Sequence, residues 1–310
     1  MPPSFDILGI GCVVVDDLMY VDAFPSADAK IRIRRAERQF GGLTGTALVA
    51  AAKLGAKCAF AGLLGPDPLS ASVSQNFTDH GIDVSGVVQR EDARPIHSVI
   101  IVAEEGHTRN VFYEFSAPIG ADPNGPNEDW IRSAQVLFLD HIGVQGDIRA
   151  ANIARAAGIP VVSDLEEVHD PQFPELLELI DHLVISEKFA LAYTKEASPA
   201  EAAMALWHSD RDTVAVTCGD KGIWYVSSIH PEPQHMPAFQ VDAVDTTGCG
   251  DVFHGAYAVS LAYGDGVDER IRFASAAAAL KATRPGGQTG APNLRELTAF
   301  MAERFAPSEG

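Results

Sequence analysis

The stretch of this chain best suited to chemistry is a glycine turn that carries an aspartate, Gly248-Cys249-Gly250-Asp251. An apolar, alanine-rich segment follows it and predicts a buried helix, so the turn lies at a helix N-terminus. The first N–H groups there lack helical partners and the helix dipole adds positive charge, which favours an anion. We predict that Asp251 deprotonates an attacking hydroxyl while the amides of Gly248, Cys249 and Gly250 stabilise a phosphoryl group in transfer.

Two separated motifs resemble the signatures of one enzyme family. Residues 245–253, Asp-Thr-Thr-Gly-Cys-Gly-Asp-Val-Phe, are similar to the C-terminal signature of the ribokinase-like, or PfkB, carbohydrate kinases. Residues 40–56, with Phe-Gly-Gly, then Thr-Ala, then Ala-Ala-Ala-Lys-Leu-Gly-Ala, resemble the N-terminal signature. The resemblance implies a three-layer α/β/α fold with a mostly parallel central sheet and a small β-sheet lid. One kinase domain then spans residues 1–310, with lid inserts at approximately 13–39 and 96–117.

The order of apolar segments agrees with that fold. After residue 136, short apolar strands alternate with helical segments, and strands of this kind are buried on both faces of a parallel sheet. Ligands of such sheets bind beyond the carboxyl ends of the strands. Earlier in the chain we predict a strand at 7–15 and a hairpin from 96–103 and 109–115.

The resemblance also implies which residues contact the acceptor sugar. Asp16 matches the family's carboxylate that binds sugar hydroxyls, and Gly41 and Gly42 open the helix beside it. The family usually carries asparagine where this chain has Leu43 and Thr46, so the contacts of a ribose or fructose site are altered. The candidate substrate-binding residues are Asp16, Lys30, Gly41, Gly42, Thr46 and Arg109.

Lys30, Arg32 and Arg34 alternate with two isoleucines. If this segment is a strand, its cations share one face. In so acidic a chain, such a face favours an anionic substituent on the substrate, whereas the alternative is a solvated edge strand whose charges prevent aggregation. Arg109 has the same two interpretations.

The nucleotide and cation sites follow from the resemblance as well. ATP is expected against Thr217, Gly219 and Gly222, and against the late loop at Thr283 and Gly287. Mg²⁺ is expected to be held largely through water, near Asp164, Glu166, Glu167 or Glu187. A monovalent cation, K⁺, is expected at a further set of residues: Asp245, Thr247, Arg284 and Gly286.

Composition limits the other functions. The net charge of −19 argues against nucleic acid and anionic membranes as partners. Four cysteines without Cys-x-x-Cys spacing indicate free thiols in a reducing compartment. No segment resembles a signal peptide or a membrane span. We expect a cytoplasmic protein, dimeric through its lid, whose partners are a sugar and ATP.

The acceptor remains open at this point. The last third of the chain resembles the branch that contains sulfofructose kinase, and the lid and N-terminal half resemble ketohexokinase, so keto-sugars and their anionic derivatives are both candidates. A nucleoside kinase of the same family is an alternative. A non-catalytic ligand-binding protein on a kinase scaffold is another, because a fold does not determine a function.

Overall fold

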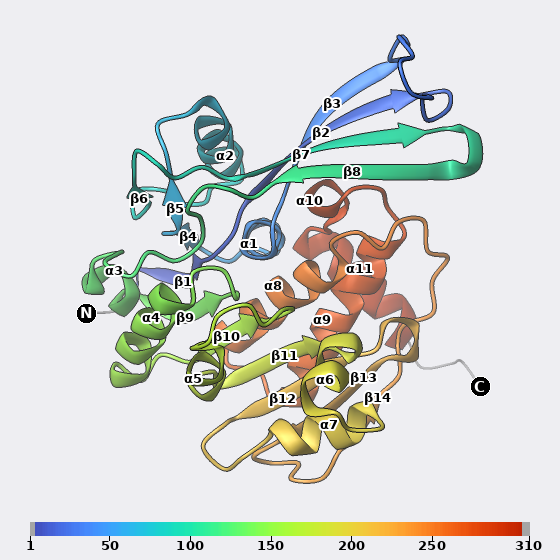
Figure 1. Ribbon diagram of the computed structural model, residues 1–310. Coiled ribbons are helices and arrows are strands. Elements are labelled where there is room, and N and C mark those ends of the chain that lie inside the picture. Colours follow the sequence, from blue (N-terminus) through green and yellow to red (C-terminus); the bar gives the residue numbers. More distant parts are fainter. Residues whose placement is uncertain (1–3, 306–310) are drawn as a thin grey trace, which may run out of the picture.

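A central eight-stranded sheet organises residues 4–305, the part of the chain that the computed structural model describes (Figure 1). Its strand order is β14-β13-β12-β11-β10-β9-β1-β4, and the neighbours are parallel except at β12–β13 and β13–β14. The strands are β1 (Phe5–Ile10), β4 (Cys58–Phe60), β9 (Ala134–Leu139), β10 (Val161–Asp164), β11 (His182–Ser186), β12 (Thr213–Thr217), β13 (Ile223–Ser227) and β14 (Gln234–Met236). The predicted mostly parallel sheet is confirmed.

Helices cover both faces of this sheet and form two apolar cores. On one face are α1 (Leu43–Lys53), α2 (Pro68–Asp79), α8 (Cys249–Ala262), α9 (Val267–Ala282) and α11 (Leu294–Phe305). On the other are α3 (Glu128–Arg132), α4 (Val144–Ala156), α5 (Phe173–Glu178), α6 (Glu187–Thr194) and α7 (Pro199–Leu206). The result is the expected three-layer α/β/α arrangement.

The close packing of α1 against α8 depends on one glycine. A Cβ on Gly255 would lie 2.2 Å from the carbonyl oxygen of Ala47, so no larger residue fits between the two backbones. This approach brings the start of α1 beside the glycine turn that opens α8.

A second, four-stranded sheet extends away from the core as the lid (Figure 1). Its order is β3-β2-β7-β8, with β2 (Val14–Val21), β3 (Arg35–Gly41), β7 (Ile96–Ala103) and β8 (Thr108–Glu114). A short 3₁₀ turn, η1 (Glu105–His107), joins β7 to β8 and confirms the predicted hairpin. Below the lid lies α10 (Gly287–Gly290). A two-stranded sheet of β5 (Leu63–Leu64) and β6 (Val88–Gln89) completes the strands.

Two sequence predictions about strands are wrong. The strand expected at 7–15 is two strands, because the chain leaves the central sheet after Ile10 and enters the lid at Val14. The strand expected at 30–34 is a loop between β2 and β3. Its isoleucines, Ile31 and Ile33, are 46% and 42% exposed, so no apolar face is buried there that would hold the segment in a sheet.

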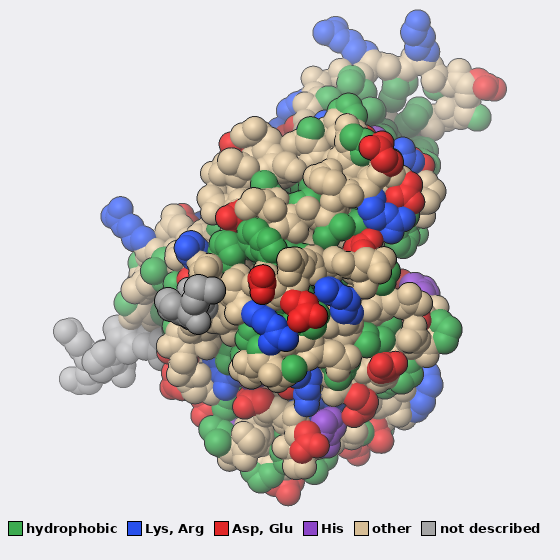
Figure 2. Space-filling view, turned by 90° about the vertical axis from the view of Figure 1, so that its left-hand side faces the viewer, with side chains coloured by type: hydrophobic (Ala, Val, Ile, Leu, Met, Phe, Trp, Pro, Cys, Tyr) green, Lys and Arg blue, Asp and Glu red, His purple; other side chains and the backbone are tan. Residues whose placement is uncertain are grey.

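The loop at 22–34 therefore presents its cations to solvent at the outer end of the lid. Arg34 pairs with Asp22 and with Glu104, at 2.9 Å from the latter. Lys30 and Arg32 are exposed in the same loop. Lys and Arg side chains gather at the distant upper end of the molecule (Figure 2). The predicted basic face is not formed.

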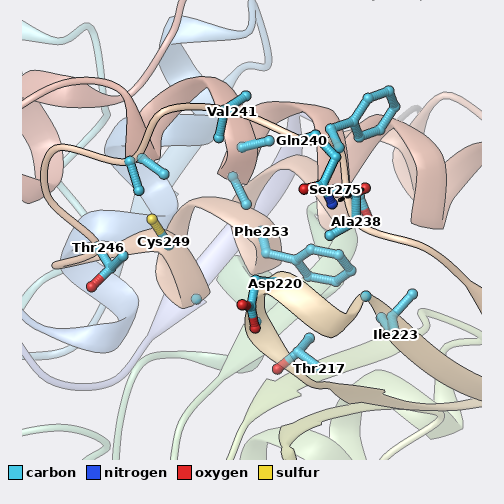
Figure 3. A pocket seen from close by; sticks show the side chains of 18 residues that line it. Thr217, Asp220, Ile223, Ala238, Gln240, Val241, Thr246, Cys249, Phe253 and Ser275 are labelled. Carbon is cyan, nitrogen blue, oxygen red and sulfur yellow. Dashed lines mark hydrogen bonds between the residues drawn. The ribbon is translucent and has the colours of Figure 1, made fainter.

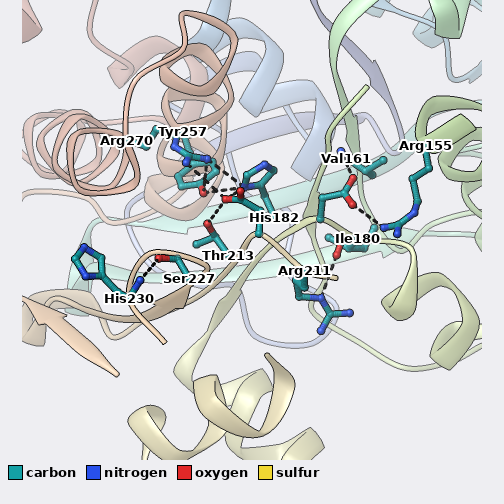
Figure 4. Close-up of polar contacts among 12 residues, drawn as sticks. Arg155, Val161, Ile180, His182, Arg211, Thr213, Ser227, His230, Tyr257 and Arg270 are labelled. Atoms are coloured by element: carbon teal, nitrogen blue, oxygen red, sulfur yellow. Dashed lines mark hydrogen bonds and ion pairs between the residues drawn. The ribbon is translucent and has the colours of Figure 1, made fainter. Parts of the chain in front are cut away.

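A buried polar network lies at the amino ends of the strands, opposite the glycine turn (Figure 4). The hydroxyl of Tyr257 lies 3.2 Å from Nδ1 of His182 and 3.4 Å from Nη1 of Arg270. Nearby, the buried guanidinium of Arg211 donates to the carbonyls of Ile180, Leu206 and Leu177. It thereby ties together the ends of α5 and α7, where backbone carbonyls are left free by the helix.

Candidate active site

Asp251 stands in the first turn of α8, next to the carboxyl ends of the central strands. Gly248 precedes the helix with a φ of 76°, a left-handed conformation that favours glycine. A Cβ on Gly248 would lie 2.9 Å from Cα of Gly287 and 3.5 Å from Cγ2 of Thr46. The turn, α1 and α10 thus meet at the predicted base.

The surroundings of Asp251 raise its pKa well above the ordinary aspartate value. Burial is the main cause, and the nearby carboxylate of Asp164 adds to it, whereas His254 opposes the shift. The residue as a whole is only partly buried. A carboxylate with a raised pKa is a better proton acceptor, which suits a general base.

His254, one turn below, holds this part of α8 in place. Its Nε2 lies 2.9 Å from the carbonyl of Val184, while Nδ1 lies 2.8 Å from the carbonyl of Gly250 and 3.1 Å from Oδ2 of Asp164. Both His254 and Asp164 are buried. Sequence reasoning missed this pair, and the only signal was a histidine inside an otherwise apolar helix.

The amides of the turn are not equally available. The N–H of Cys249 donates to the carbonyl of Thr246 at 3.2 Å and would have to leave it to bind the phosphoryl group as predicted. Within residues 4–305, no such bond is made by the N–H of Gly248 or of Gly250. A Cβ on Gly250 would meet open space, so a phosphate can approach its backbone.

The lid contributes Asp16 from β2. Its carboxylate accepts a hydrogen bond from Ser98, and burial raises its pKa. A Cβ on Gly41 would lie 3.3 Å from Oδ2 of Asp16, and one on Gly42 would lie 2.6 Å from the carbonyl of Cys12. The two glycines therefore let the lid strand and α1 come close to this carboxylate.

The neighbouring carboxylate has a structural partner instead. Asp17 binds Arg38 through two hydrogen bonds of 2.8 and 2.9 Å, and this contact lowers the pKa of Asp17 to about 2. His97 also contacts it, at 2.8 Å. Successive residues of a strand face opposite sides, so only Asp16 remains for a ligand.

Of the two predicted substrate cations, only Arg109 reaches the core. Its Nη1 donates to Oγ1 of Thr247 at 3.0 Å and so connects β8 of the lid to the glycine-turn segment. Lys30 lies in the loop at the outer end of the lid.

A third buried carboxylate organises the strand ends beside this site. Asp140 accepts hydrogen bonds from the amide of Cys12 at 2.7 Å, from the hydroxyl of Thr44 at 2.8 Å and from the amide of Ile142 at 2.8 Å. Thr44 belongs to the first turn of α1, so Asp140 ties this helix to the end of β9.

A pocket of about 280 Å³ lies on the other side of the turn (Figure 3). Cys249 and Thr246 stand at one end of it, and Phe253 projects into the middle. Its walls are mostly apolar and suit a flat, aromatic base. The lining residues are Thr217, Gly219, Asp220, Gly222, Ile223, Ala238, Phe239, Gln240, Val241, Ala243, Thr246, Cys249, Gly250, Phe253, Ser275, Ala278, Ala279 and Ala282.

Three of the five predicted nucleotide residues line this pocket: Thr217, Gly219 and Gly222. Gly287 lies beside Gly248 instead, and Thr283 ends α9 with its hydroxyl on the carbonyl of Leu280. The sequence analysis missed the wall that α9 provides. Its signal was the spacing of Ser275, Ala278, Ala279 and Ala282, which places small residues on one helical face.

The expected metal ligands lie apart, except that the charge of Glu166 helps to raise the pKa of Asp164 and of Asp251. Asp164 faces His254, and the exposed Glu167 pairs with His169. Glu187 begins α6 and lies 3.4 Å from Nζ of Lys221, close to the nucleotide pocket. Among the described residues, His, Cys, Asp and Glu form no group of three that would hold a metal directly.

The expected monovalent-cation residues do gather around Asp245. Its Oδ1 accepts from the amide of Thr247 at 2.9 Å and its Oδ2 from the amide of Gly286 at 2.8 Å. Burial opposes ionisation of this carboxyl, but these bonds and the charge of Lys281 lower its pKa overall. The ammonium of Lys281 donates to the carbonyl of Asp245 at 2.7 Å. The residues present do not fit an added K⁺, because a cation already lies there.

Comparisons with known proteins identify the family of this chain. The model of the family described as "pfkB family carbohydrate kinase" matches residues 10–294. The chain is 27% identical over 305 residues to a ribokinase of Haemophilus influenzae, covering 94% of this chain and 97% of that one. It is 26% identical over 277 residues to a fructokinase of Solanum tuberosum, covering 84% and 86%.

A solved structure shows the same fold. The crystal structure of a ribokinase from Thermotoga maritima is 26% identical and superposes with a TM-score of 0.81, covering 96% of this chain and 99% of that one. In the described residues, none of the helices combines the length and hydropathy that crossing a bilayer requires.

Proposed function

Because the chain belongs to the pfkB family of carbohydrate kinases, we propose that it transfers the γ-phosphoryl group of ATP to a primary hydroxyl of a keto-sugar or of an anionic derivative of one. Its curated relatives are ribokinases and fructokinases, and it is an ATP-dependent carbohydrate kinase. One observation carries the proposal for this chain. Asp251 opens α8 at a glycine turn that borders an apolar pocket, and Arg109, whose charge acts on the lid carboxylate Asp16, binds Thr247 in the same turn segment.

In this proposal, each residue has a role that its position supports. Asp16 accepts hydrogen bonds from sugar hydroxyls and orients the acceptor. Asp251 takes the proton of the primary hydroxyl as that oxygen attacks phosphorus. The amides of Gly248 and Gly250 stabilise the negative charge of the phosphoryl group in transfer. Arg109 fastens the lid over the site, and a closed lid keeps out water that would hydrolyse ATP.

Mg²⁺ is part of the proposal because phosphoryl transfer from ATP uses it to neutralise the phosphate charge. Glu187 would hold its hydration shell. Ser186, where the family often has asparagine, accepts a hydrogen bond from the amide of Phe189 at 3.2 Å and caps α6. This serine has a structural task, so we assign the water-mediated contact to Glu187.

The test is ADP release with ATP and Mg²⁺ against neutral keto-sugars, sugar phosphates, sulfonated sugars and nucleosides. Without the predicted basic strand, Arg109 is the one cation of the predicted set that reaches the core. We therefore expect neutral keto-sugars to be phosphorylated. Anionic sugars should be phosphorylated only if Arg109 leaves Thr247 and binds their anionic group. Turnover confined to nucleosides would replace the sugar assignment, and no turnover with any acceptor would favour a binding protein.

The lid also supports the proposed dimer. Strand β8 is an edge strand, and its apolar side chains are largely exposed, with Phe112 at 56% and Tyr113 at 71%. Exposed apolar patches on an unpaired edge commonly mark interaction sites. Light scattering should show a dimer, and a monomer at micromolar concentration would refute this part.

Four free cysteines and ATP as phosphate donor support a cytoplasmic location.

A further inference from the structure

Lys281 is a buried cation in the last turn of α9. Its side chain is 0% exposed, and its ammonium donates to the carbonyl of Asp245 at 2.7 Å and lies 3.9 Å from the Oδ2 of the same residue. A lysine is rarely buried unless its charge has a partner. The partner here is the residue that ties the glycine-turn segment to the loop after α9.

The loop after α9 leaves room for this side chain. A Cβ on Gly290 would lie 3.2 Å from Cε of Lys281, 3.1 Å from the carbonyl of Pro285 and 3.2 Å from that of Arg284. The end of the lysine thus lies among backbone oxygens of 284–290 on one side and Asp245 on the other. Glycine at 290 is the residue that intrudes least on it.

This enclosure has the chemistry of a monovalent-cation site. Backbone carbonyls and one carboxylate are the oxygen ligands that replace the hydration shell of K⁺. The sequence predicted K⁺ among these residues, yet a positive charge attached to the chain already contacts them. A second cation between Asp245 and these carbonyls would lie against the ammonium and be repelled.

We propose that Lys281 takes the place of a monovalent cation beneath the phosphate-binding turn, so that the kinase works without K⁺. Its ammonium neutralises Asp245, whose carboxylate holds the amides of Thr247 and Gly286. The turn is thereby ordered before ATP binds, at any K⁺ concentration. This inference rests on the proposed kinase function, but the ion site itself does not.

The test compares the native chain with Lys281→Met at constant ionic strength, replacing tetramethylammonium by K⁺. For the native chain we expect ADP release to change less than twofold, and the thermal midpoint to stay constant. Lys281→Met should be destabilised and lose at least tenfold in activity without K⁺. Added K⁺ should restore part of both, because it occupies the vacated position.

Lys53→Met is the matched control. Its ammonium also holds this loop, donating to the carbonyls of Gln288 at 2.8 Å and Ala291 at 2.7 Å, but it does not contact Asp245. The control should be destabilised without gaining any response to K⁺. A response equal to that of Lys281→Met would mean that K⁺ acts on the loop in general and would overturn the proposal.

Thallium(I), a K⁺ mimic with strong anomalous scattering, gives a readout that needs neither sugar nor turnover. Crystals of the native chain should show no thallium beside Asp245, whereas crystals of Lys281→Met should. Thallium beside Asp245 in the native chain, or a rise in its activity of tenfold or more with K⁺, would overturn the proposal. If Lys281→Met does not fold, the native chain alone still decides between these outcomes.

Discussion

The two ends of α8 bury polar groups for opposite purposes. At its start, the carboxylates of Asp251 and Asp164 lie close together with His254 in contact with Asp164, and the pKa of both carboxyls is raised. Nearly two turns later, Tyr257 joins His182 and Arg270 in a hydrogen-bonded network beside Asp212 (Figure 4). At the first place the carboxyls have a raised pKa, which suits proton transfer. At the second, hydrogen bonds attach the helix to its neighbours.

The comparison shows where this protein keeps buried carboxylates whose charges destabilise the folded state. Burying a carboxylate near another one is unfavourable, and such groups concentrate at functional sites. Hydrogen-bonded networks of neutral and cationic groups fix packing instead. Substitutions at the start of α8 should therefore change activity, whereas substitutions at the far network should change stability.

The largest expected effect is on catalysis. Asp251→Asn keeps the shape of the side chain but removes the base, and we expect kcat to fall by about 10²–10⁴-fold. The thermal midpoint should not fall, because the substitution also removes a buried charge. Steady-state ADP release and thermal unfolding measure the two quantities. A loss in kcat under tenfold would remove Asp251 from its role.

The far network should give acid sensitivity. Burial lowers the pKa of His182 to about 4, while an unfolded histidine titrates near 6.5. Between these values the unfolded chain binds a proton that the folded chain excludes, so the free energy of unfolding falls as pH falls. The loss should be on the order of 3 kcal/mol by pH 4, and stability above pH 7 should be retained. Denaturant unfolding at several pH values measures it.

Asp147, in the first turn of α4, provides a contrast of opposite sign. Burial raises its pKa, with a contribution from Asp140, and both of its oxygens lack a hydrogen-bond partner among the described residues. Asp147→Asn should therefore stabilise the protein at neutral pH, and the gain should disappear below about pH 4.

The control for the acid sensitivity is His182→Gln. In this variant the free energy of unfolding should fall less between pH 6.5 and 4, and an unchanged dependence on pH would show that His182 is not its source.

Tyr257→Phe should cost about 1–3 kcal/mol of stability, because the lost hydroxyl leaves His182 and Arg270 without one of their partners. We expect kcat within twofold of that of the native chain. Urea unfolding and ADP release distinguish the two. A fall in kcat without a fall in stability would show that the network acts on the site and would break the comparison.

The smallest effect is expected at the lid. Arg109→Ala removes one exposed hydrogen bond to Thr247, so KM for the sugar should rise only roughly 2- to 5-fold. The thermal midpoint should remain within a degree or two. Arg94→Ala, which removes an exposed lid pair with Glu114, is the control and should leave KM unchanged.

The sequence by itself determined the class of fold and the position of the candidate catalytic turn. Strands that are buried on both faces can be recognised from their apolar residues alone. The glycine turn that bears Asp251 can likewise be recognised from local sequence, because it precedes a helix. The two signatures supplied the family. Alternation misled at residues 30–34, because periodicity shows which side chains would share a face but not whether another element covers that face.

Tertiary structure decided everything that depends on groups distant in the chain. Lys281 and Gly290 have no apparent link to Asp245 until packing brings them together, and His254 gains its meaning only from Asp164 on another strand. The sequence predicted residues that would bind a cation, but only the packing of α9 showed that the ammonium of Lys281 is the cation beside Asp245. Charges are readable from a sequence, but the distances over which they act are set by how the helices pack.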